Sequence, residues 1–166
     1  RGVSVSVAVG HRIDGPDGAP VLVLGNSLGT TTELWAEVVP LLADRFRIVR
    51  YDHRGHGGSP VPSGPYEIAD LGADVVALLD RLEIEHAAYC GVSIGGMVAL
   101  WLGANAPGRL TTVIPCCTAA HLGNASAWSE RAATVLAAGS TEPIADAVVS
   151  RWVTPPFAAA NPAVVA

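Results

Sequence analysis

A short stretch of the chain combines a potential nucleophile with the residues needed to expose it. Ser93 lies within Gly91-Val92-Ser93-Ile94-Gly95, after an apolar run that ends at Cys90 and before a run with helical spacing. A serine on a sharp turn between strand and helix is strained and exposed, and the flanking glycines let strand and helix approach closely. The helix start also directs free N–H groups at an oxyanion beside the serine. The pattern predicts that Ser93 is a catalytic nucleophile. The alternative is a serine that only caps the helix.

Hydrophobic patterns on both sides of this stretch predict the elements that position it. Alternating valines predict a half-buried strand from Val3 to Val9, followed by a turn-rich segment from Gly10 to Pro20. Continuous apolar runs predict further strands, and apolar residues at three- and four-residue intervals predict helices. The strands are expected at 21–24, 46–51, 86–90 and 110–117, and the helices at 30–42, 68–82 and 96–106. This alternation favours an α/β fold, with a mostly parallel sheet covered by helices on both faces.

Two local signals refine the helix predicted at 30–42. Thr30 and Glu33 have the spacing of a capping box, which would start the helix at Thr30. Pro40 falls inside the apolar pattern, so it should kink the helix or mark its last turn.

The character of the sequence changes after Thr118. Residues 128–138 and 143–152 predict two alanine-rich helices with no strand between them, and prolines at 155, 156 and 162 should break up the tail. We therefore expect residues 1–118 to form the N-terminal part of an α/β core. Residues 119–166 are expected to start a helical cap, with the remainder of the core absent.

Composition excludes several classes of protein. Half of the 166 residues are hydrophobic and 15% are charged, which is typical of a globular chain. The net charge is −5 and the only basic side chains other than histidine are ten scattered arginines, so nucleic acid is not an expected partner. Apolar runs fall short of a membrane span. The three cysteines have no C-x-x-C spacing and no metal-ligand pattern is present, so we expect reduced thiols, no metal, no cofactor and a cytoplasmic location.

Four motifs together resemble the α/β-hydrolase superfamily and, within it, the 3-oxoadipate enol-lactonases of aromatic-compound breakdown. They are Leu-Gly-Asn-Ser-Leu-Gly-Thr at 24–30, Tyr-Asp-His-Arg-Gly-His-Gly-Gly-Ser at 51–59, Gly-Val-Ser-Ile-Gly-Gly-Met at 91–97, and Arg-Trp-Val-Thr-Pro at 151–155. The second is widespread in the superfamily, and the first and third together are more typical of the lactonases. Val153 departs from the family, which usually has an aromatic residue there.

The resemblance implies a serine hydrolase that cleaves a small enol-lactone carrying a carboxylate. It implies Ser93 as nucleophile and an oxyanion hole made by two backbone N–H groups. One N–H belongs to Ile94, and the other belongs to Ser27, with Leu28 as the next candidate. His53 and His56 would have a structural role, in hydrogen bonds that hold the turn after their strand.

The resemblance also implies a cap over Ser93 that contributes substrate contacts. The implied contacts are Trp128, Arg131, Arg151 and Trp152, because an arginine in the pocket suits a substrate carboxylate. It is equally open that these arginines and tryptophans only tie the cap helices together.

The base and the acid of a catalytic triad are harder to find. In this superfamily they follow the serine, in the order acid and then histidine. The only histidine after Ser93 is His121, and the acids there are Glu130, Glu142 and Asp146, all in predicted cap helices. His121 could act as the base if its loop folds back. The simpler interpretation is that this chain is the N-terminal part of a longer enzyme and is inactive alone.

Two other functions remain open at this point. The first is another α/β-hydrolase, such as a carboxylesterase, a cofactor-free perhydrolase or a carbon–carbon bond hydrolase. The second is a non-catalytic fragment that binds or associates, either with itself or with a complementing C-terminal fragment, through an uncovered sheet edge.

Overall fold

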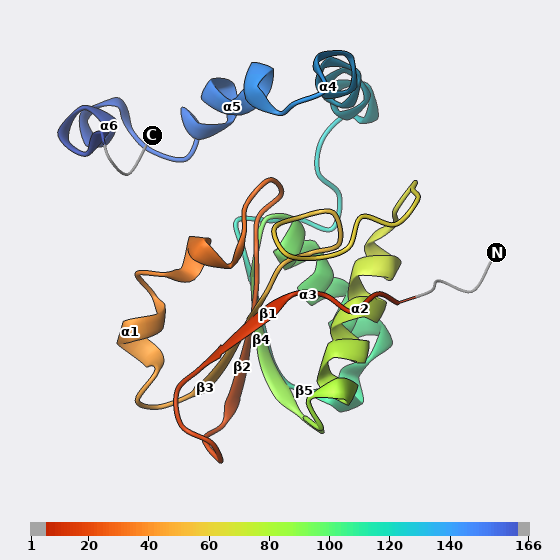
Figure 1. Cartoon of the computed structure of the whole chain (residues 1–166), viewed down its shortest axis with the longest axis vertical. Coiled ribbons are helices and arrows are strands. Elements are labelled where there is room, and N and C mark those ends of the chain that lie inside the picture. Colours follow the sequence, from red (N-terminus) through yellow and green to blue (C-terminus); the bar gives the residue numbers. More distant parts are fainter. Residues whose placement is uncertain (1–5, 163–166) are drawn as a thin grey trace. The chain divides into compact units, whose positions relative to one another are not determined.

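The computed structural model describes residues 6–162, and the chain divides after Ala120 into two compact units. Within the described residues, the first unit contains a five-stranded sheet with the order β1-β3-β2-β4-β5 (Figure 1). Its strands are β1 (His11–Asp14), β2 (Val21–Gly25), β3 (Arg47–Tyr51), β4 (Ala87–Val92) and β5 (Leu110–Cys116).

Four of the strands are parallel, and this places the segments that follow them at one edge of the sheet. β2 pairs in parallel with β3 and β4, β4 pairs in parallel with β5, and β1 runs antiparallel to its neighbour β3. Because the carboxyl ends of parallel strands meet at one edge, the residues after β2, β3 and β4 lie close together there. This is the edge at which open α/β sheets bind ligands.

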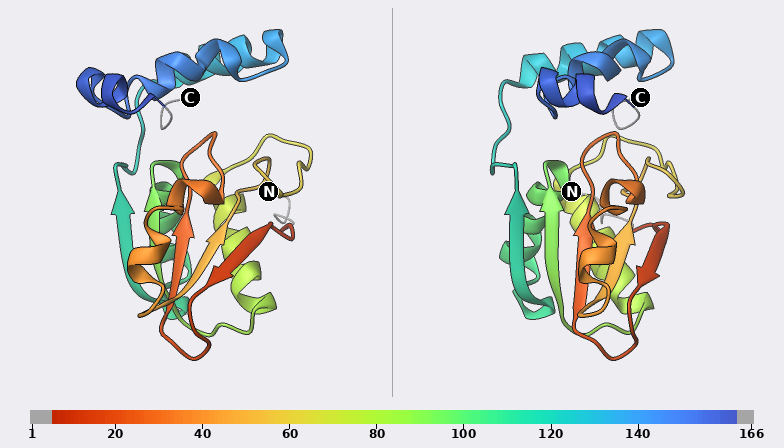
Figure 2. Two further views of the ribbon diagram at one scale, coloured as in Figure 1. Left: turned by 60° about the vertical axis from the view of Figure 1, so that its left-hand side comes forward. Right: turned by 90° about the vertical axis from the view of Figure 1, so that its left-hand side faces the viewer.

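Helices cover both faces of the sheet, as the sequence predicts. α1 (Val39–Leu42) lies on one face, and α2 (Ile68–Arg81) and α3 (Ile94–Asn105) lie on the other (Figures 1 and 2). A short 3₁₀ helix, η2 (Pro107–Arg109), leads from α3 into β5. Alternate residues of the central strands therefore enter two different cores. Leu22 and Leu24 pack with α1, whereas Val23 packs with α2 and α3.

The predicted helix at 68–82 agrees closely with α2. Asp70 accepts a 2.7 Å hydrogen bond from the backbone N–H of Glu67, which completes a capping box at the helix start. The face toward the sheet carries buried apolar residues at helical spacing, and they are Leu71, Val75, Leu78 and Leu79.

The predicted strand from Val3 to Val9 is wrong where it can be compared. Val3 and Val5 lie outside the described residues, and the next two valines are not in a strand. The backbone N–H of Val7 donates to Asp74 Oδ1 of α2 at 2.7 Å, and Val9 is buried in the core, so this segment packs on a helix. The strand instead lies at His11–Asp14, inside the segment predicted to be turn, where it pairs with β3.

The single helix predicted at 30–42 is also wrong. The segment forms a 3₁₀ helix, η1 (Thr32–Trp35), followed by the short α1. The capping side chain belongs to Thr31 rather than Thr30, because the Thr30 hydroxyl instead donates to the carbonyl oxygen of Ser27 at 2.8 Å. Pro40 lies in the first turn of α1, where its missing N–H breaks no helical hydrogen bond.

The second unit consists of helices among its described residues. They are α4 (Ala125–Ala138), α5 (Glu142–Val149) and α6 (Pro155–Ala160). The first two match the predicted helices approximately. The third corrects the expectation that prolines break the tail, because Pro155 and Pro156 occupy the first turn of α6, where proline is tolerated.

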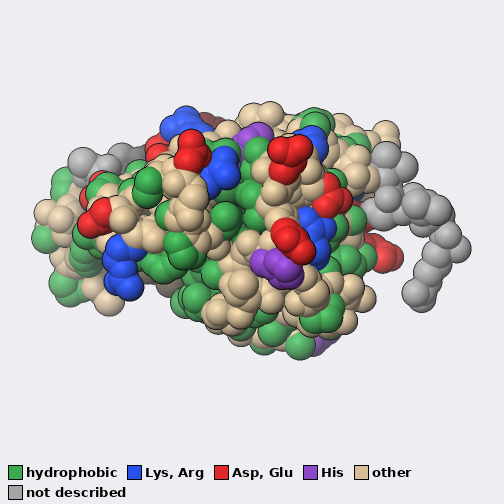
Figure 3. All heavy atoms as spheres, turned by 90° about the horizontal axis from the view of Figure 1, so that it is seen from below, with side chains coloured by type: hydrophobic (Ala, Val, Ile, Leu, Met, Phe, Trp, Pro, Cys, Tyr) green, Lys and Arg blue, Asp and Glu red, His purple; other side chains and the backbone are tan. Residues whose placement is uncertain are grey.

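One face of the molecule carries mixed charges. On the face drawn in Figure 3, acidic and basic side chains are interspersed among hydrophobic and uncharged ones. Among the described residues, no helix is both long enough and apolar enough to cross a bilayer.

Candidate active site

Ser93 occupies a strained turn between β4 and α3. Its backbone has φ 56° and ψ −113°, a left-handed conformation that costs a non-glycine residue free energy unless neighbours hold it. The Ser93 N–H donates to the carbonyl oxygen of Cys116 at 3.0 Å. The Ser93 carbonyl oxygen accepts from the Thr118 hydroxyl at 2.7 Å and from the Met97 N–H at 3.0 Å. The end of β5 and the first turn of α3 therefore fix the turn from both sides.

The two glycines of the motif are required by close backbone packing, as predicted. A Cβ on Gly91 would overlap the carbonyl group of Gly95 and lie 2.8 Å from the backbone nitrogen of Gly96. A Cβ on Gly95 would overlap the carbonyl oxygen of Gly25 and lie 2.6 Å from its carbon. The start of α3 is thus pressed directly against the ends of β4 and β2.

The two N–H groups predicted to form an oxyanion hole lie on segments that are directly joined. The N–H of Gly95, next to Ile94, donates to the carbonyl oxygen of Asn26, next to Ser27, at 3.1 Å. Within the described residues, neither the Ile94 N–H nor the Ser27 N–H has a hydrogen-bond acceptor. Both donors are therefore available to a ligand. Binding of an oxyanion by these two groups stays a prediction.

Asn26 fixes the loop that carries Ser27, and the sequence analysis missed it. Its side-chain amide donates to the carbonyl oxygen of Tyr51 at 2.8 Å and accepts from the Trp35 indole N–H at 2.8 Å. Its own carbonyl oxygen contacts His53 Nε2 at 3.0 Å. A fully buried asparagine must satisfy these groups within the protein. The available signal was a polar residue placed directly after a buried strand.

Asp52 joins the loop after β3 to the first residue of η1. Its carboxylate accepts from the Thr32 N–H at 2.8 Å and from the Gly58 N–H at 3.0 Å. Its carbonyl oxygen accepts from the Ser59 hydroxyl at 2.6 Å. These contacts order the loop from 52 to 59, which lies beside the Ser27 loop.

The two histidines of this loop have different environments. Burial, opposed by the hydrogen bond to the Asn26 carbonyl, lowers the pKa of His53 to about 4, so its ring is neutral near neutral pH. His56 Nε2 accepts from the Gly29 N–H at 2.9 Å, and its Nδ1 lies 3.2 Å from the carbonyl oxygen of Arg54. The His56 ring therefore bonds within its own turn, as the resemblance implies, whereas the His53 ring bonds to the neighbouring loop at Asn26.

A base for Ser93 is not identified in the described part of the chain. The Ser93 hydroxyl has no hydrogen-bond partner among the described residues. His121 is the first residue of the second unit and is exposed. Of the acids considered, Glu130 lies in α4, and Glu142 and Asp146 lie in α5. A catalytic role for any of these residues stays a prediction.

The predicted substrate contacts lie in the second unit, and the contacts of three of them are with residues of the same unit. The Arg131 guanidinium stacks on the Trp128 ring at 4.7 Å, and the Trp128 indole N–H donates to the Leu122 carbonyl oxygen at 2.7 Å. Arg151 Nε donates to the Ala147 carbonyl oxygen at 3.0 Å, and Trp152 is half exposed. Their contact with a substrate stays a prediction.

All three cysteines are free thiols. Cys90 Sγ and Cys116 Sγ lie 3.9 Å apart on neighbouring strands, and burial raises the pKa of the Cys90 thiol to about 11. Such a thiol is a poor nucleophile and a poor metal ligand at neutral pH. Across residues 6–162, no group of three or more His, Cys, Asp or Glu side chains could hold a metal ion.

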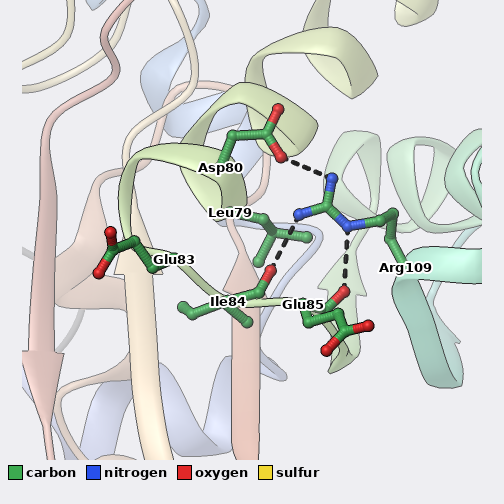
Figure 4. A pocket seen from close by; sticks show the side chains of 6 residues that line it. All are labelled: Leu79, Asp80, Glu83, Ile84, Glu85 and Arg109. Carbon is green, nitrogen blue, oxygen red and sulfur yellow. Dashed lines mark hydrogen bonds and ion pairs between the residues drawn. The ribbon is translucent and has the colours of Figure 1, made fainter.

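A pocket of about 270 Å³ lies where α2 ends and β4 begins (Figure 4). Arg109 spans it, with hydrogen bonds to Asp80 Oδ1 at 2.7 Å and to the carbonyl oxygens of Ile84 and Glu85 at 2.9 and 3.0 Å. These bonds satisfy the guanidinium, which fastens the start of β5 to the end of α2. Because Ser93 follows the opposite end of β4, this pocket is separate from the candidate active site.

The fold and the turn at Ser93 together define a class of protein. The profile of the alpha/beta hydrolase fold family matches residues 20–150, so the chain belongs to the α/β-hydrolase family. It is 43% identical over 159 residues to 3-oxoadipate enol-lactonase 2 of Acinetobacter baylyi, covering 96% of this chain and 59% of that protein. It is 40% identical over 149 residues to 3-oxoadipate enol-lactonase 1 of the same organism, covering 88% and 54%.

A solved structure supports the same relationship. The enol-lactonase from Burkholderia xenovorans matches with a TM-score of 0.90 at 42% identity, covering 95% of this chain and 61% of that one. The predicted α/β-hydrolase fold and the resemblance to enol-lactonases are therefore confirmed. The chain spans between 54% and 61% of the length of these relatives.

Proposed function

We propose that the full gene product is a serine hydrolase that converts 3-oxoadipate enol-lactone to 3-oxoadipate in the breakdown of aromatic compounds. The observation that carries the proposal is the strained turn at Ser93, with the unpaired Ile94 and Ser27 N–H groups on the two segments beside it. The substrate is inferred from the enol-lactonases, to which 96% of this chain can be aligned.

In the proposed reaction, Ser93 Oγ attacks the ring carbonyl carbon and passes its proton to a base. The carbonyl oxygen becomes negatively charged and accepts hydrogen bonds from the Ile94 and Ser27 N–H groups. The ring C–O bond then breaks, the enol oxygen takes the proton from the base and the enol tautomerises to the ketone, and an acyl-enzyme remains on Ser93. Water attacks this ester, regenerates the serine and releases the open-chain keto acid.

The base and its orienting carboxylate are expected downstream of Ser93, as is usual in this family. We therefore expect residues 1–166 alone to be inactive and the full gene product to be active. The free thiols of Cys90, Cys116 and Cys117 support a reducing compartment, so we propose that the enzyme works in the cytoplasm.

The test follows the loss of enol-lactone absorbance with the full gene product and its Ser93→Ala variant. We expect turnover that disappears in the variant, and turnover of the lactone that exceeds turnover of a simple aryl ester. Faster turnover of the aryl ester would favour a carboxylesterase. Equal turnover by parent and variant would show that Ser93 is not the nucleophile.

A further inference from the structure

Each of the two predicted oxyanion donors shares a rigid peptide group with a carbonyl oxygen that is itself hydrogen-bonded. The Ile94 N–H lies in one plane with the Ser93 carbonyl, and the Ser27 N–H lies in one plane with the Asn26 carbonyl. Because the peptide group is planar, a bond that fixes the carbonyl oxygen also fixes the direction of the N–H. The groups that bond to these two oxygens therefore direct the two donors.

The peptide group that carries the Ile94 N–H is held by one backbone donor and one side-chain donor. The Ser93 carbonyl oxygen accepts from the Met97 N–H at 3.0 Å, which is the first hydrogen bond of α3. The same oxygen accepts from the Thr118 hydroxyl at 2.7 Å, from the segment after β5. The helix and the end of the sheet thus direct the Ile94 N–H together.

The peptide group that carries the Ser27 N–H is held in the same way, and its side-chain donor is His53. The Asn26 carbonyl oxygen accepts from the Gly95 N–H at 3.1 Å and lies 3.0 Å from His53 Nε2. A carbonyl oxygen has no proton to donate, so Nε2 carries the proton of the neutral ring. The arrangement of one backbone donor and one side-chain donor is therefore repeated at the second predicted oxyanion donor.

The two bonds to the Asn26 oxygen tie it to different parts of the first unit. Gly95 belongs to the first turn of α3, next to Ile94. Its bond alone would let the Ser27 N–H move together with the nucleophile turn. His53 instead lies two residues after the end of β3, so its ring ties the same peptide group to the sheet. Two bonds from different directions leave the Ser27 N–H one orientation.

The His53 ring carries a cost that packing alone does not explain. The residue is 1% exposed, and within the described residues its Nδ1 has no hydrogen-bond partner. A buried polar atom without a partner costs free energy, and an apolar side chain of similar size would avoid that cost. In the same part of the chain, the one hydrogen bond of the ring is the bond from Nε2 to the Asn26 carbonyl oxygen. The use of this histidine therefore lies in that bond.

We propose that His53 is a positioning residue for the oxyanion hole, whose Nε2–H holds the Asn26 carbonyl and thereby directs the Ser27 N–H toward an oxyanion beside Ser93. A hydrogen bond accepted by the carbonyl also polarises the peptide group, which strengthens its N–H as a donor. This inference rests on the proposed function of Ser93. It goes beyond a role in holding the turn after β3, because the bond of His53 is made to the neighbouring loop.

Two substitutions of nearly equal length isolate this hydrogen bond. Glutamine and methionine are both unbranched, and the amide nitrogen of glutamine reaches the place of histidine Nε2. His53→Gln can therefore still donate to the Asn26 carbonyl oxygen, whereas His53→Met fills the same space without a donor. A role in packing predicts that Met replaces His53 at least as well as Gln does. The proposal predicts that Gln is the better replacement.

The experiment measures the rate at which a fluorophosphonate labels Ser93 in the full gene product and in each variant, followed by intact mass. We expect His53→Met to react about tenfold more slowly than the parent, a smaller loss than the ~10²–10³ that follows removal of a donor. His53→Gln should react within about threefold of the parent. With an ester substrate, the loss in His53→Met should fall on kcat, with KM little changed. Urea unfolding of both variants establishes that the labelling rates do not follow stability.

The outcomes separate this inference from the proposed function. Equal labelling of His53→Met and His53→Gln, or faster labelling of His53→Met, would overturn the role of His53 while Ser93 remains the nucleophile. A parent that is not labelled at Ser93 would overturn both. The ¹⁵N resonances of the ring in the parent give a test that needs no variant. The proposal requires the proton on Nε2, so a ring with its proton on Nδ1 would contradict the hydrogen bond to Asn26.

Discussion

The side-chain hydroxyl of Thr118 donates a 2.7 Å hydrogen bond to the carbonyl oxygen of Ser93. Two residues earlier, the Cys116 carbonyl oxygen accepts the Ser93 N–H, so the last residue of β5 and the segment just after it bind both backbone polar groups of Ser93. Cys117, between these two residues, has φ 46°, so it is left-handed like Ser93. The strained turn at Ser93 is thus held by a segment that is itself strained, as is common at functional sites.

Removing the Thr118 hydroxyl should make the backbone turn at Ser93 less rigid. We expect Thr118→Val, which is nearly isosteric, to lower the free energy of unfolding by about 1 kcal/mol and to slow fluorophosphonate labelling of Ser93. Thr118→Ser keeps the donor and should label at close to the parent rate. Urea unfolding and labelling kinetics check the two effects. Equal labelling of the Val and Ser variants would contradict the role of the hydroxyl.

A methyl group on Gly95 should prevent folding of the first unit. The clash is with the backbone of Gly25, which cannot rotate away as a side chain can. We expect Gly95→Ala to give no cooperative unfolding transition, measured by circular dichroism. Gly103 in the same helix is the matched control, because its Cβ would meet Val113 Cγ2 at an ordinary 3.7 Å. Gly103→Ala should instead stabilise the protein by about 0.5–1 kcal/mol.

His53 should make the protein less stable in mild acid. The pKa of His53 is about 4 in the folded protein and about 6.5 in an unfolded chain, so the unfolded state binds more protons between these values. The free energy of unfolding should therefore fall by about 3 kcal/mol from this residue as pH drops from 6.5 to 4. In His53→Gln, the free energy of unfolding measured by urea titration should fall less over this pH range. An identical pH dependence would contradict the assignment.

The ion pair between Arg54 and Asp74 should stabilise the fold mainly because Arg54 neutralises the buried Asp74 carboxylate. Arg54 Nε and Nη2 lie 2.7 and 2.8 Å from the two Asp74 oxygens, and both side chains are buried. We expect Arg54→Met to cost about 3–5 kcal/mol, because it strands a buried carboxylate. Adding Asp74→Asn, which can still accept from the Val7 N–H, should recover part of this loss. A double-mutant cycle with urea unfolding measures the coupling between Arg54 and Asp74. Strictly additive losses in the free energy of unfolding would contradict this coupling.

The sequence predicted those features that depend on local pattern. The Gly-x-Ser-x-Gly spacing predicted a strained serine between strand and helix, and Ser93 has positive φ with glycines in backbone contact. The apolar run at 21–24 predicted β2, because a strand buried on both faces is apolar throughout. The amphipathic pattern at 68–82 predicted α2, because a helix buried on one side has apolar residues at three- and four-residue intervals.

Features that depend on distant partners were not predictable in the same way. The alternating valines at 3–9 suggested a strand, but the Val7 N–H is satisfied by Asp74, which lies 67 positions away. The hydrogen bonds of Asn26 and His56 likewise join loops separated by about 25 residues. The periodicity of hydrophobic residues along the chain does not reveal such long-range pairings. Pro155 and Pro156 were misread because proline both ends helices and starts them.

The glycine contacts around Ser93 constrain how the sequence can drift over evolutionary time. At Gly91 and Gly95 the obstacle to a side chain is main chain, so no second substitution elsewhere can make room. At Gly25 the obstacle is the phenol of Tyr89, whose hydroxyl also bonds that of Tyr51 at 2.7 Å. Lineages that replace Gly25 must therefore also have shortened residue 89. Among homologues, positions 25 and 89 should covary, whereas 91 and 95 should each admit one residue only.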